Sequence, residues 1–372
     1  MNTAGLFQRK QAKDDNASVI SISPNQLDWC VIGSVAIVFL ACCGLLCILC
    51  MFPWIAVTCS AVLESVPENI VDFVPDTISF GSCMGNWMGL SLLDHIKTDA
   101  HVFLGDNVYF DDYIWELQVK YTLTYKYFGQ YISPNIMPYM AMVYRKLSCD
   151  AHFKALMRRI PYVMATWDDH DFGMDNCDGS FPYKLKTREM FIDFWKLNPS
   201  RKKPNAGIYG MYFFRNVSHS VLVVIPDLFY YKSDTQLLGI DQWGWIRSYV
   251  QPLANEADFI ILAMSSAVKT LVITHRTEMF GLLNVFPVGK SIVVSGDLHH
   301  PYIEHLITGH IEVITSPLSE SGSQPRRAAQ MCLQNQTSCT VDGNDDNYAV
   351  IDIWKRKASV FVAEGPIMEV LF

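Results

Sequence analysis

The sequence lacks a surplus of positive charge. Its 372 residues carry 29 Lys and Arg against 37 Asp and Glu, which gives a net charge of −8. Because a nucleic-acid surface relies on Lys and Arg to neutralise phosphates, we expect no nucleic-acid partner. The acidic balance does not exclude an anionic substrate, since bound cations can reverse the local field.

Cysteines spaced for a structural zinc site are also missing beyond residue 59, and internal repeats are missing throughout. Six of the 11 cysteines lie between residues 30 and 59. The other five lack the paired spacing of a structural zinc site; they are Cys83, Cys149, Cys177, Cys332 and Cys339. No stretch recurs at a fixed period. Half of the residues are hydrophobic, so the chain can form the core of one large α/β domain or two small ones.

Charged residues are absent from Trp29 to Leu63. The densest apolar part, Val31 to Phe52, is about long enough for one membrane span of roughly 20 residues. It is longer, and lies farther from the start, than the apolar core of a cleaved signal peptide. The sequence therefore predicts an uncleaved transmembrane anchor at residues 29–53, with a buried core helix as the alternative.

The charges on either side of this anchor predict its orientation. Three basic residues precede it at positions 9–13, and three acidic residues follow it at positions 64–72. The positive-inside tendency makes residues 1–28 a cytosolic tail, with the rest of the chain lumenal or extracellular after a linker at 54–76. We therefore expect a single-pass membrane protein. Two sequons, at Asn216 and Asn335, agree with this side of the membrane and predict glycosylation.

Beyond the linker, strand and helix patterns first alternate and then cluster. Strands are expected at 77–83, 100–104, 162–166, 208–214, 220–225, 259–264, 291–295, 311–315, 348–353 and 359–363. Helices are expected at 90–96, 113–132, 139–160, 184–197 and 241–253, and a long polar loop at 318–347. This order predicts an α/β sandwich of two sheets with outer helices, in a domain over residues 77–372.

Three of the predicted strands end in acidic turns. They are Gly105-Asp106, Asp168-Asp169-His170-Asp171 and Gly296-Asp297-Leu298-His299-His300. Clustered carboxylates are costly because like charges repel and burial raises their pKa values, and a metal ion resolves that conflict. Any one turn alone is also typical of a solvated loop. Together they predict a metal centre at the carboxyl ends of the strands, with Asp106 bridging two ions by its position.

The motifs together resemble the PhoD-like alkaline phosphatases of the metallophosphatase superfamily. The resemblance spans about residues 77–320 and rests on SFGSC (79–83), FLGDNVYFDD (103–112), TWDDHDFG (166–173) and SGDLHH (295–300). Secondary markers are GIYGMYFF (207–214), LLGIDQWGWI (237–246) and ITSPLS (314–319). It implies a four-layer α/β/β/α sandwich after the N-terminal transmembrane helix. It also implies a membrane-anchored, metal-dependent hydrolase of phosphoric esters, in which a metal-bound hydroxide attacks phosphorus in line.

The resemblance also implies roles for individual residues. The expected metal ligands are Cys83, Asp106, Tyr109, Asp169, Asp297 and His299. His170 is the expected catalytic residue together with Asp169, and it would protonate the leaving oxygen or stabilise the transition state. Supporting roles fall to Asp168, Asp171, Asn176 and His300. We expect two or more ions among Fe, Ca, Zn, Mn and Mg. A buried thiol and a packed aromatic ring are the alternatives for Cys83 and Tyr109.

The chain departs from this family at one position that concerns the substrate. Relatives carry Asp-Thr-Arg where this chain has Asp227-Leu228-Phe229, so the arginine expected to help bind phosphate is absent. Lys232 and Arg247 are the candidate replacements. The expected substrate is a phosphorylated small molecule or lipid. The alternatives are a phosphodiesterase or phospholipase on the same scaffold, and a non-catalytic metal-binding receptor or scaffold.

Overall fold

The computed structural model describes residues 7–8, 70–85, 89–109, 137–197, 206–319, 338–340 and 346–372. The predicted anchor at 29–53 lies outside these residues. So do the predicted helix at 113–132, the sequon at Asn335, most of the tail and linker, and most of the loop at 318–347. None of the helices within the described ranges combines the length and the apolar composition that a membrane span needs.

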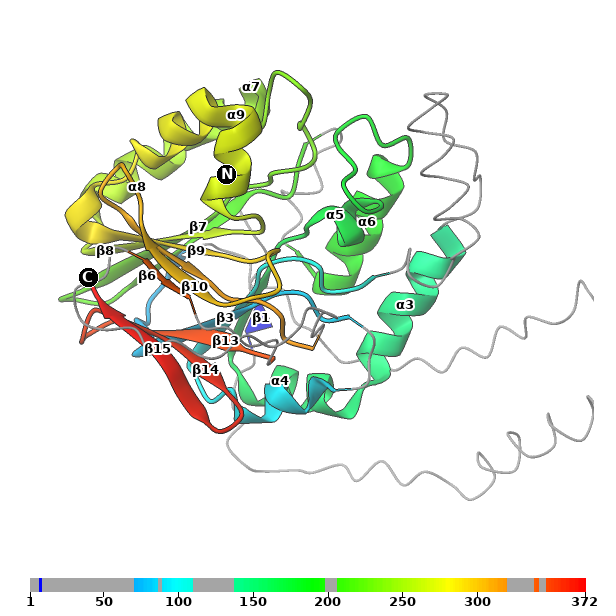
Figure 1. Cartoon of the computed structure of the whole chain (residues 1–372), viewed down its shortest axis with the longest axis horizontal. Helices are drawn as coiled ribbons and strands as arrows, with labels where there is room; N and C mark the ends of the chain where they lie inside the picture. Colours follow the sequence, from blue (N-terminus) through cyan, green and yellow to red (C-terminus); the bar gives the residue numbers. More distant parts are fainter. Residues whose placement is uncertain are drawn as a thin grey trace, which may run out of the picture. The chain divides into compact units, whose positions relative to one another are not determined.

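Seven strands make up the first of two β-sheets (Figure 1). They are β1 (Phe7–Gln8), β3 (Thr77–Gly81), β4 (Ala100–Phe103), β5 (Tyr162–Ala165), β13 (Tyr348–Asp352), β14 (Lys357–Val362) and β15 (Gly365–Leu371). Their order across the sheet is β1-β5-β4-β3-β13-β14-β15. Strands β3, β4 and β5 run parallel, and β1 pairs antiparallel with β5 at the edge. Strand β1 belongs to the residues that we predict to be a cytosolic tail.

Eight strands form the second sheet. They are β2 (Ile70–Val71), β6 (Gly210–Arg215), β7 (Ser220–Ile225), β8 (Phe259–Met264), β9 (Ser291–Ser295), β10 (Tyr302–His305), β11 (Ile311–Ile314) and β12 (Ser338–Thr340). Their order is β12-β10-β11-β9-β8-β7-β6-β2. Strands β7, β8, β9 and β11 run parallel to their neighbours in this series, and β6 and β7 form an antiparallel hairpin.

The parallel strands at the centre of both sheets explain the continuous apolar runs of the sequence. A strand in a parallel sheet is covered on both faces, and β5 and β8 are buried along their whole length. Because parallel strands point the same way, their carboxyl ends meet at one edge of the sheet. The three acidic turns follow β4, β5 and β9, so the fold places each of them at such an edge.

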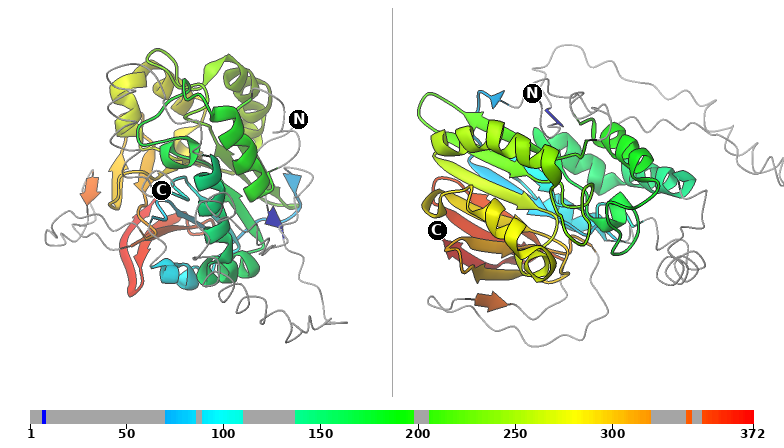
Figure 2. Two further views of the ribbon diagram at one scale, coloured as in Figure 1. Left: turned by 90° about the vertical axis from the view of Figure 1, so that its right-hand side faces the viewer. Right: turned by 90° about the horizontal axis from the view of Figure 1, so that it is seen from above.

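Helices lie outside the two packed sheets (Figures 1 and 2). They are η3 (Leu90–His95), α3 (Met137–Cys149), α4 (Ala151–Arg159), α5 (Asp169–Phe172), α6 (Lys184–Trp195), α7 (Gly239–Trp245), η6 (Ile246–Val250), α8 (Gln251–Glu256), α9 (Val268–Leu283) and η7 (Val288–Lys290). Phe103 of β4 contacts Phe153 of α4 and Trp195 of α6. On the other side, α7, α8 and α9 cover the second sheet (Figure 1).

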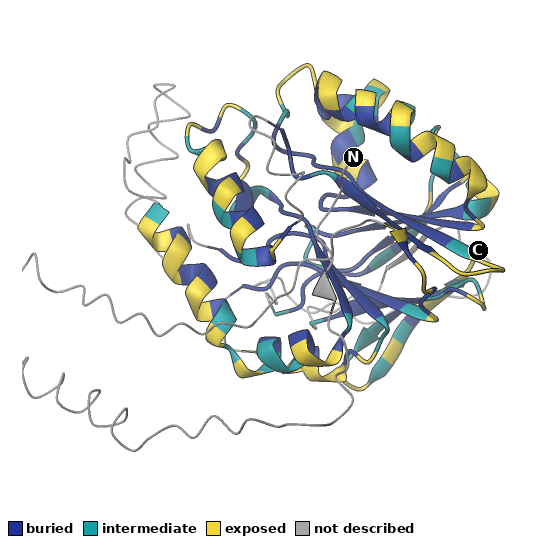
Figure 3. Cartoon of the chain, turned by 180° about the vertical axis from the view of Figure 1, so that it is seen from behind, coloured by how far each residue is buried: buried dark blue, intermediate teal, exposed yellow. Residues whose placement is uncertain are grey.

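One of the two apolar clusters among the described residues lies between the sheets. Phe80 and Val102 of the first sheet share it with Ile261 and Val294 of the second. Figure 3 shows the central strands of both sheets buried, with many of the exposed residues on the outer sides of the helices. The described residues thus form a mixed α/β fold of two sheets with outer helices, as the sequence predicts.

Two of the longer helical segments differ from the prediction. The helix expected at 139–160 is two helices, because the Asp150 side chain accepts a hydrogen bond from the Phe153 N–H (2.8 Å) and caps the start of α4. Helix α9 was not predicted. Its first half is rich in β-branched residues, which have low helix propensity, although its buried residues, from Val268 and Leu271 to Leu282, follow a helical period.

Candidate metal centre

The carboxyl ends of β3, β4, β5 and β9 bring candidate ligands from four separate parts of the sequence together. Donor atoms of Cys83, Asp106 and His299 lie within 4.8 Å of one another. The same holds for Asp106, Asp169 and His170. Asp106 belongs to both groups, which is the geometry that a carboxylate shared between two ions requires.

The two oxygens of the Asp106 carboxylate face different partners. Oδ2 accepts a hydrogen bond from the Tyr109 hydroxyl (2.9 Å) and lies 3.7 Å from the Cys83 Sγ. Oδ1 accepts one from the His170 backbone N–H (3.3 Å). The Tyr109 hydroxyl also lies 3.1 Å from the His299 Nε2. Each oxygen of Asp106 therefore points to one of the two ligand groups.

Several residues of this region have a positive backbone φ, which residues other than glycine rarely adopt. Seven described non-glycine residues have a positive φ, and five of them belong to the candidate site. Such conformations cost of order 1–3 kcal/mol each and gather at functional sites. The five residues are Cys83 (φ 58°), Asp106 (φ 50°), Asn176 (φ 57°), Asp297 (φ 74°) and His299 (φ 50°).

Two glycines allow these turns to approach one another. At Gly105, which has φ +110°, a Cβ atom would lie 2.7 Å from the Asp168 Cβ. At Gly296, a Cβ atom would lie 2.5 Å from the Ser82 Oγ. A side chain at Gly105 would push the acidic turns after β4 and β5 apart, and one at Gly296 would push the turn after β9 away from Ser82, so the glycine in each Gly-Asp pair is needed for close packing.

The buried Asp171 carboxylate holds two of the turns together. It accepts hydrogen bonds from the Asn107 N–H (3.0 Å to Oδ1) and from the Asp168 N–H (3.1 Å to Oδ2). The Asn107 side-chain amide adds a bond to the Thr166 carbonyl oxygen (2.8 Å). These contacts bind the turn after β4 to the turn after β5. Asp171 therefore positions the candidate ligands on both turns.

Ser316 links two candidate ligands that are far apart in the sequence. Its hydroxyl donates to the Cys83 Sγ (3.0 Å) and accepts from the His299 N–H (3.1 Å). Asn347 holds Ser316 in turn, because its Oδ1 accepts from the Ser316 N–H (3.0 Å). Neither Ser316 nor Asn347 has a predicted role from the sequence. The only signal was that Ser316 lies in the ITSPLS marker.

The remaining predicted residues make hydrogen bonds within the acidic turns or to neighbouring loops. Asp169 accepts a hydrogen bond from the Asn176 N–H at Oδ2 (2.6 Å). Asp168 accepts one from the Ser266 hydroxyl (3.0 Å). The His300 Nδ1–H donates to the Leu298 carbonyl oxygen (2.7 Å) within its own turn.

A pocket of about 400 Å³ opens beside these groups. Asp297 lies outside both three-residue groups but lines this pocket with Asp168, Asp169 and Asn176. Its lining also includes Lys232, whose Nζ lies 4.4 Å from the centre of the Phe229 ring. Arg247, the other candidate for binding phosphate, does not line this pocket. Lys232 therefore offers the positive side chain beside the acidic turns.

Burial raises the pKa of most ionisable groups at this site. It raises the pKa of the Cys83 thiol to about 11 and that of Asp297 to about 6. It also holds the pKa of Asp106 and of Tyr109 well above their ordinary values. A divalent cation would reverse these shifts, because it favours the ionised form of each ligand. The donors present, which are carboxylate, imidazole, phenol and thiol, therefore fit a metal centre.

Comparisons with known proteins bear on the fold. No family model and no curated protein sequence matches this chain. A solved structure of PhoD is similar to it, with a TM-score of 0.55, 14% sequence identity, and coverage of 82% of this chain and 70% of PhoD. A dimetal phosphatase from Danio rerio has a TM-score of 0.40 and 9% identity, covering 80% of this chain and 98% of that protein. The chain thus has a PhoD-like fold, and at this level of identity the likeness concerns the fold alone.

Proposed function

We propose that the protein is a metal-dependent hydrolase of phosphoric esters that holds two or more ions. The observation that carries this proposal is the pair of three-residue groups that share Asp106. Two ions about 3.5–4 Å apart can clamp the attacking and leaving oxygens of a displacement at phosphorus. The likeness to the PhoD fold supports the same reaction class by analogy.

The two ligand groups suit different ions. Cys83 and His299 offer sulfur and nitrogen beside Asp106, a set that suits Fe or Zn. The other group adds the carboxylate of Asp169, with Asp297 in the adjoining pocket, and its oxygen atoms suit Mn, Mg or Ca. When bound, such ions polarise a phosphoryl oxygen and lower the pKa of a coordinated water.

We assign the proton of the leaving group to His170. In hydrolysis a water oxygen bonds to phosphorus and releases a proton to solvent, the bond from phosphorus to the leaving oxygen breaks, and the leaving oxygen takes up a proton. The His170 ring packs on Tyr109, with 4.3 Å between ring centres, and its backbone N–H is fixed by Asp106. Its imidazole therefore lies beside the shared carboxylate in a defined place, as general acid catalysis requires.

Lys232 is our candidate for binding the phosphate of the substrate. Phe229 stands where the related phosphatases carry an arginine, and the Lys232 ammonium group lies over the ring of Phe229. The ammonium thus lies next to the place of the missing guanidinium. It would act as a point charge rather than as a bidentate donor.

One preparation of the full chain tests the proposal. Bound metals are measured by elemental analysis, and hydrolysis of p-nitrophenyl phosphate and bis-p-nitrophenyl phosphate is assayed before and after chelation. We expect stoichiometric metal and turnover that a chelator abolishes. Asp169→Ala should lose most activity and remain folded, whereas Asp72→Asn, at an exposed aspartate, serves as the matched control.

The outcome also separates the alternatives. Faster hydrolysis of the diester would identify a phosphodiesterase on the same scaffold. Stoichiometric metal without turnover of either ester would overturn the enzymatic proposal and favour a metal-binding receptor or scaffold. Full activity of Asp169→Ala would show that the reaction takes place elsewhere.

Membrane anchoring is a separate part of the proposal. It rests on the uncharged stretch at residues 29–53 and on the charges around it. A single crossing there would place residues 1–28 and the domain on opposite sides, which excludes the pairing of β1 with β5. Asn216, exposed in the turn between β6 and β7, reports the side. If Asn216 is glycosylated and a protease added on the cytosolic side of the membrane digests the N-terminal tail, the anchor is supported and the pairing of β1 with β5 is excluded.

A further inference from the structure

The loop at residues 226–238, between β7 and α7, carries Lys232, which lines the pocket at the metal centre. Apolar side chains bury both ends of this loop in the core, at residues 229–230 and at residues 237–238. The segment between them, residues 232–236, is polar, and all of it except Lys232 is exposed. Apolar burial therefore fixes the ends of the loop but not the segment that carries Lys232.

Helix α9 supplies two polar side chains that bond to the backbone of this loop. The Nε2–H of His275 donates to the Ser233 carbonyl oxygen (2.6 Å). The Glu278 carboxylate accepts hydrogen bonds from the backbone N–H groups of residues 237–238. Because Ser233 follows Lys232 directly, the His275 bond fixes the backbone next to Lys232, and Glu278 fixes the other end of the polar segment.

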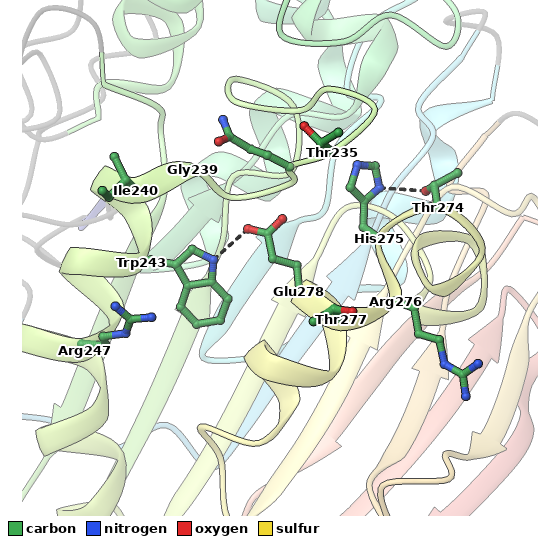
Figure 4. A pocket seen from close by; sticks show the side chains of 11 residues that line it. Thr235, Gly239, Ile240, Trp243, Arg247, Thr274, His275, Arg276, Thr277 and Glu278 are labelled. Carbon is green, nitrogen blue, oxygen red and sulfur yellow. Dashed lines mark hydrogen bonds between the residues drawn. The ribbon is translucent and has the colours of Figure 1, made fainter.

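These two side chains of α9 are themselves held in place (Figure 4). A carbonyl oxygen only accepts hydrogen bonds, so the neutral imidazole of His275 carries its proton on Nε2, and its Nδ1 accepts from the Thr274 hydroxyl (2.8 Å). The Glu278 carboxylate also accepts from the Trp243 Nε1–H (2.7 Å). Trp243 packs on α9, where a Cβ at Gly281 would lie 3.4 Å from its ring. Both groups therefore meet the loop in a fixed orientation.

Helix α9 departs from regular geometry at its bond to the loop. His275 has non-helical angles inside α9 (φ −126°, ψ 39°). A residue keeps unusual backbone angles when the contacts around it hold it there, and both ring nitrogens of His275 are engaged, with Thr274 and with Ser233. The contact forms part of the wall of the pocket at the metal centre and of a neighbouring pocket of about 610 Å³, because Thr274 and His275 line both.

From these contacts we infer that His275 and Glu278 are positioning residues for substrate binding, because they hold the loop that presents Lys232 to the metal centre. Glu278 does not line the pocket at the metal centre, so it acts on the substrate through the loop. This inference rests on the proposed function, because it takes Lys232 as the group that binds the phosphate of the substrate.

Replacement of Glu278 should weaken phosphate binding through Lys232. In Glu278→Gln the side-chain amide would place an N–H group against the backbone N–H donors of the loop. With the metal-loaded full chain, we expect KM for p-nitrophenyl phosphate to rise about tenfold, because a hydrogen bond to a charged group is typically worth that factor. The value of kcat and the metal content should stay the same, since lost uniform binding raises KM alone. Lys232→Met, which removes the charge and keeps an aliphatic side chain, should show the same rise.

The double variant separates positioning from a merely structural role. If Glu278 acts through Lys232, then Glu278→Gln added to Lys232→Met should raise KM no further. Rises in KM that multiply in the double variant would overturn the inference and leave the proposed function intact. Glu189→Gln, at an exposed position on α6, is the matched control and should keep the KM of the unchanged protein.

A conservative pair of variants tests the bond from His275. His275→Gln keeps an N–H donor for the Ser233 carbonyl oxygen, whereas His275→Leu removes the donor and keeps the site filled. We expect KM to rise in His275→Leu and to stay near that of the unchanged protein in His275→Gln. Equal KM values in the two variants would show that the bond to Ser233 does not position the loop.

Binding of inorganic phosphate separates failure of the inference from failure of the proposed function. If the metal-loaded protein hydrolyses no ester, the proposed function is wrong, and calorimetric titration with phosphate decides the role of the loop. Equally weakened binding in Lys232→Met and Glu278→Gln would support the inference. Unchanged affinity in Glu278→Gln, or no phosphate binding by the unchanged protein, would overturn it.

Discussion

Two of the regions that bury carboxylates, the candidate metal centre and strand β11, differ in what surrounds those groups. At the candidate metal centre, Asp106 and Asp168 are each 2% exposed, and thiol, imidazole and further carboxylates lie around them. In β11, Glu312 is fully buried, and it belongs to neither of the two groups of candidate metal ligands. Its Oε1 accepts hydrogen bonds from the Val268 N–H (2.8 Å) and the Ser295 hydroxyl (2.6 Å).

Burial raises the pKa of the carboxylates in both regions, so a raised pKa does not by itself identify a site. The two regions differ in how many candidate ligands lie together and in the backbone conformation of the buried carboxylate residue. Asp106 takes a positive φ and faces two ligand groups, whereas Glu312 lies in a regular strand and joins β11 to β9 and the start of α9. A carboxylate that strained turns bring to other ligands indicates a metal centre, and an isolated one indicates a structural contact.

The largest effect is expected from Asp106→Asn. Because Asp106 belongs to both ligand groups, its loss should remove both ions and abolish turnover, beyond the roughly 10–100-fold loss typical of a supporting residue. The unchanged protein should also gain thermal stability when metal is added, since a ligand that binds the folded state stabilises it, and the variant should not.

Elemental analysis and thermal unfolding with and without metal check this prediction, with Asp72→Asn as the exposed control. Retention of stoichiometric metal by Asp106→Asn would show that Asp106 is not shared. The two regions would then differ only in backbone conformation, which is a positive φ at Asp106 and a regular strand at Glu312.

The next largest effect is expected from His170→Asn. If His170 gives its proton to the leaving oxygen, kcat should fall by roughly 10²–10⁴-fold while metal content stays the same. The loss should be greater for an alkyl phosphate than for p-nitrophenyl phosphate, because nitrophenolate leaves readily without a proton. Loss of one ion from the variant would instead make His170 a ligand of the second group.

A smaller effect is expected from Asp171→Asn, because Asp171 acts through the turns that it joins. An amide cannot accept all the hydrogen bonds that the carboxylate takes from Asn107 and Asp168. Metal affinity or activity should fall by about 10–100-fold. Titration of the metal-free variant with Zn²⁺ or Mn²⁺ measures this directly, and an unchanged affinity would remove Asp171 from the supporting set.

Much of the metal centre could be predicted from the sequence because its signals are local. Gly105-Asp106 and Asp169-His170 each follow an apolar strand directly, and neighbouring parallel strands place such turns together. Ser316 could not be predicted, since its role arises from a contact with Cys83 across 233 residues. Its own neighbours in the sequence carry no sign of that contact.

The fold shows the same division between local and distant information. Strands such as β7 and β8 have the predicted bounds because their apolar runs end at turn residues. Helix α9, which lines the pocket beside the metal centre, was missed because its packing on the second sheet overrides the low helix propensity of its β-branched residues. Glu312 was missed for a related reason, since nothing adjacent in the sequence marks it as buried.

Glu312→Gln is expected to have the smallest effect on the metal centre. It should, however, change how the free energy of unfolding depends on pH. Burial raises the pKa of Glu312 from 4.5 to about 7. As pH rises through this range the unfolded chain releases the proton first, so the folded state loses stability, on the order of 3 kcal/mol at about 1.4 kcal/mol per pKa unit. The glutamine variant lacks this loss. Its free energy of unfolding, measured with denaturant, should therefore fall less than that of the unchanged protein between pH 5 and pH 8, with metal content unaltered.

Glu189→Gln, at an exposed position on α6, should behave as the unchanged protein. Equal pH dependence in Glu312→Gln and the unchanged protein would mean that Glu312 ionises at its ordinary pKa. Loss of metal from Glu312→Gln would instead extend the metal centre to β11 and remove the contrast between the two regions.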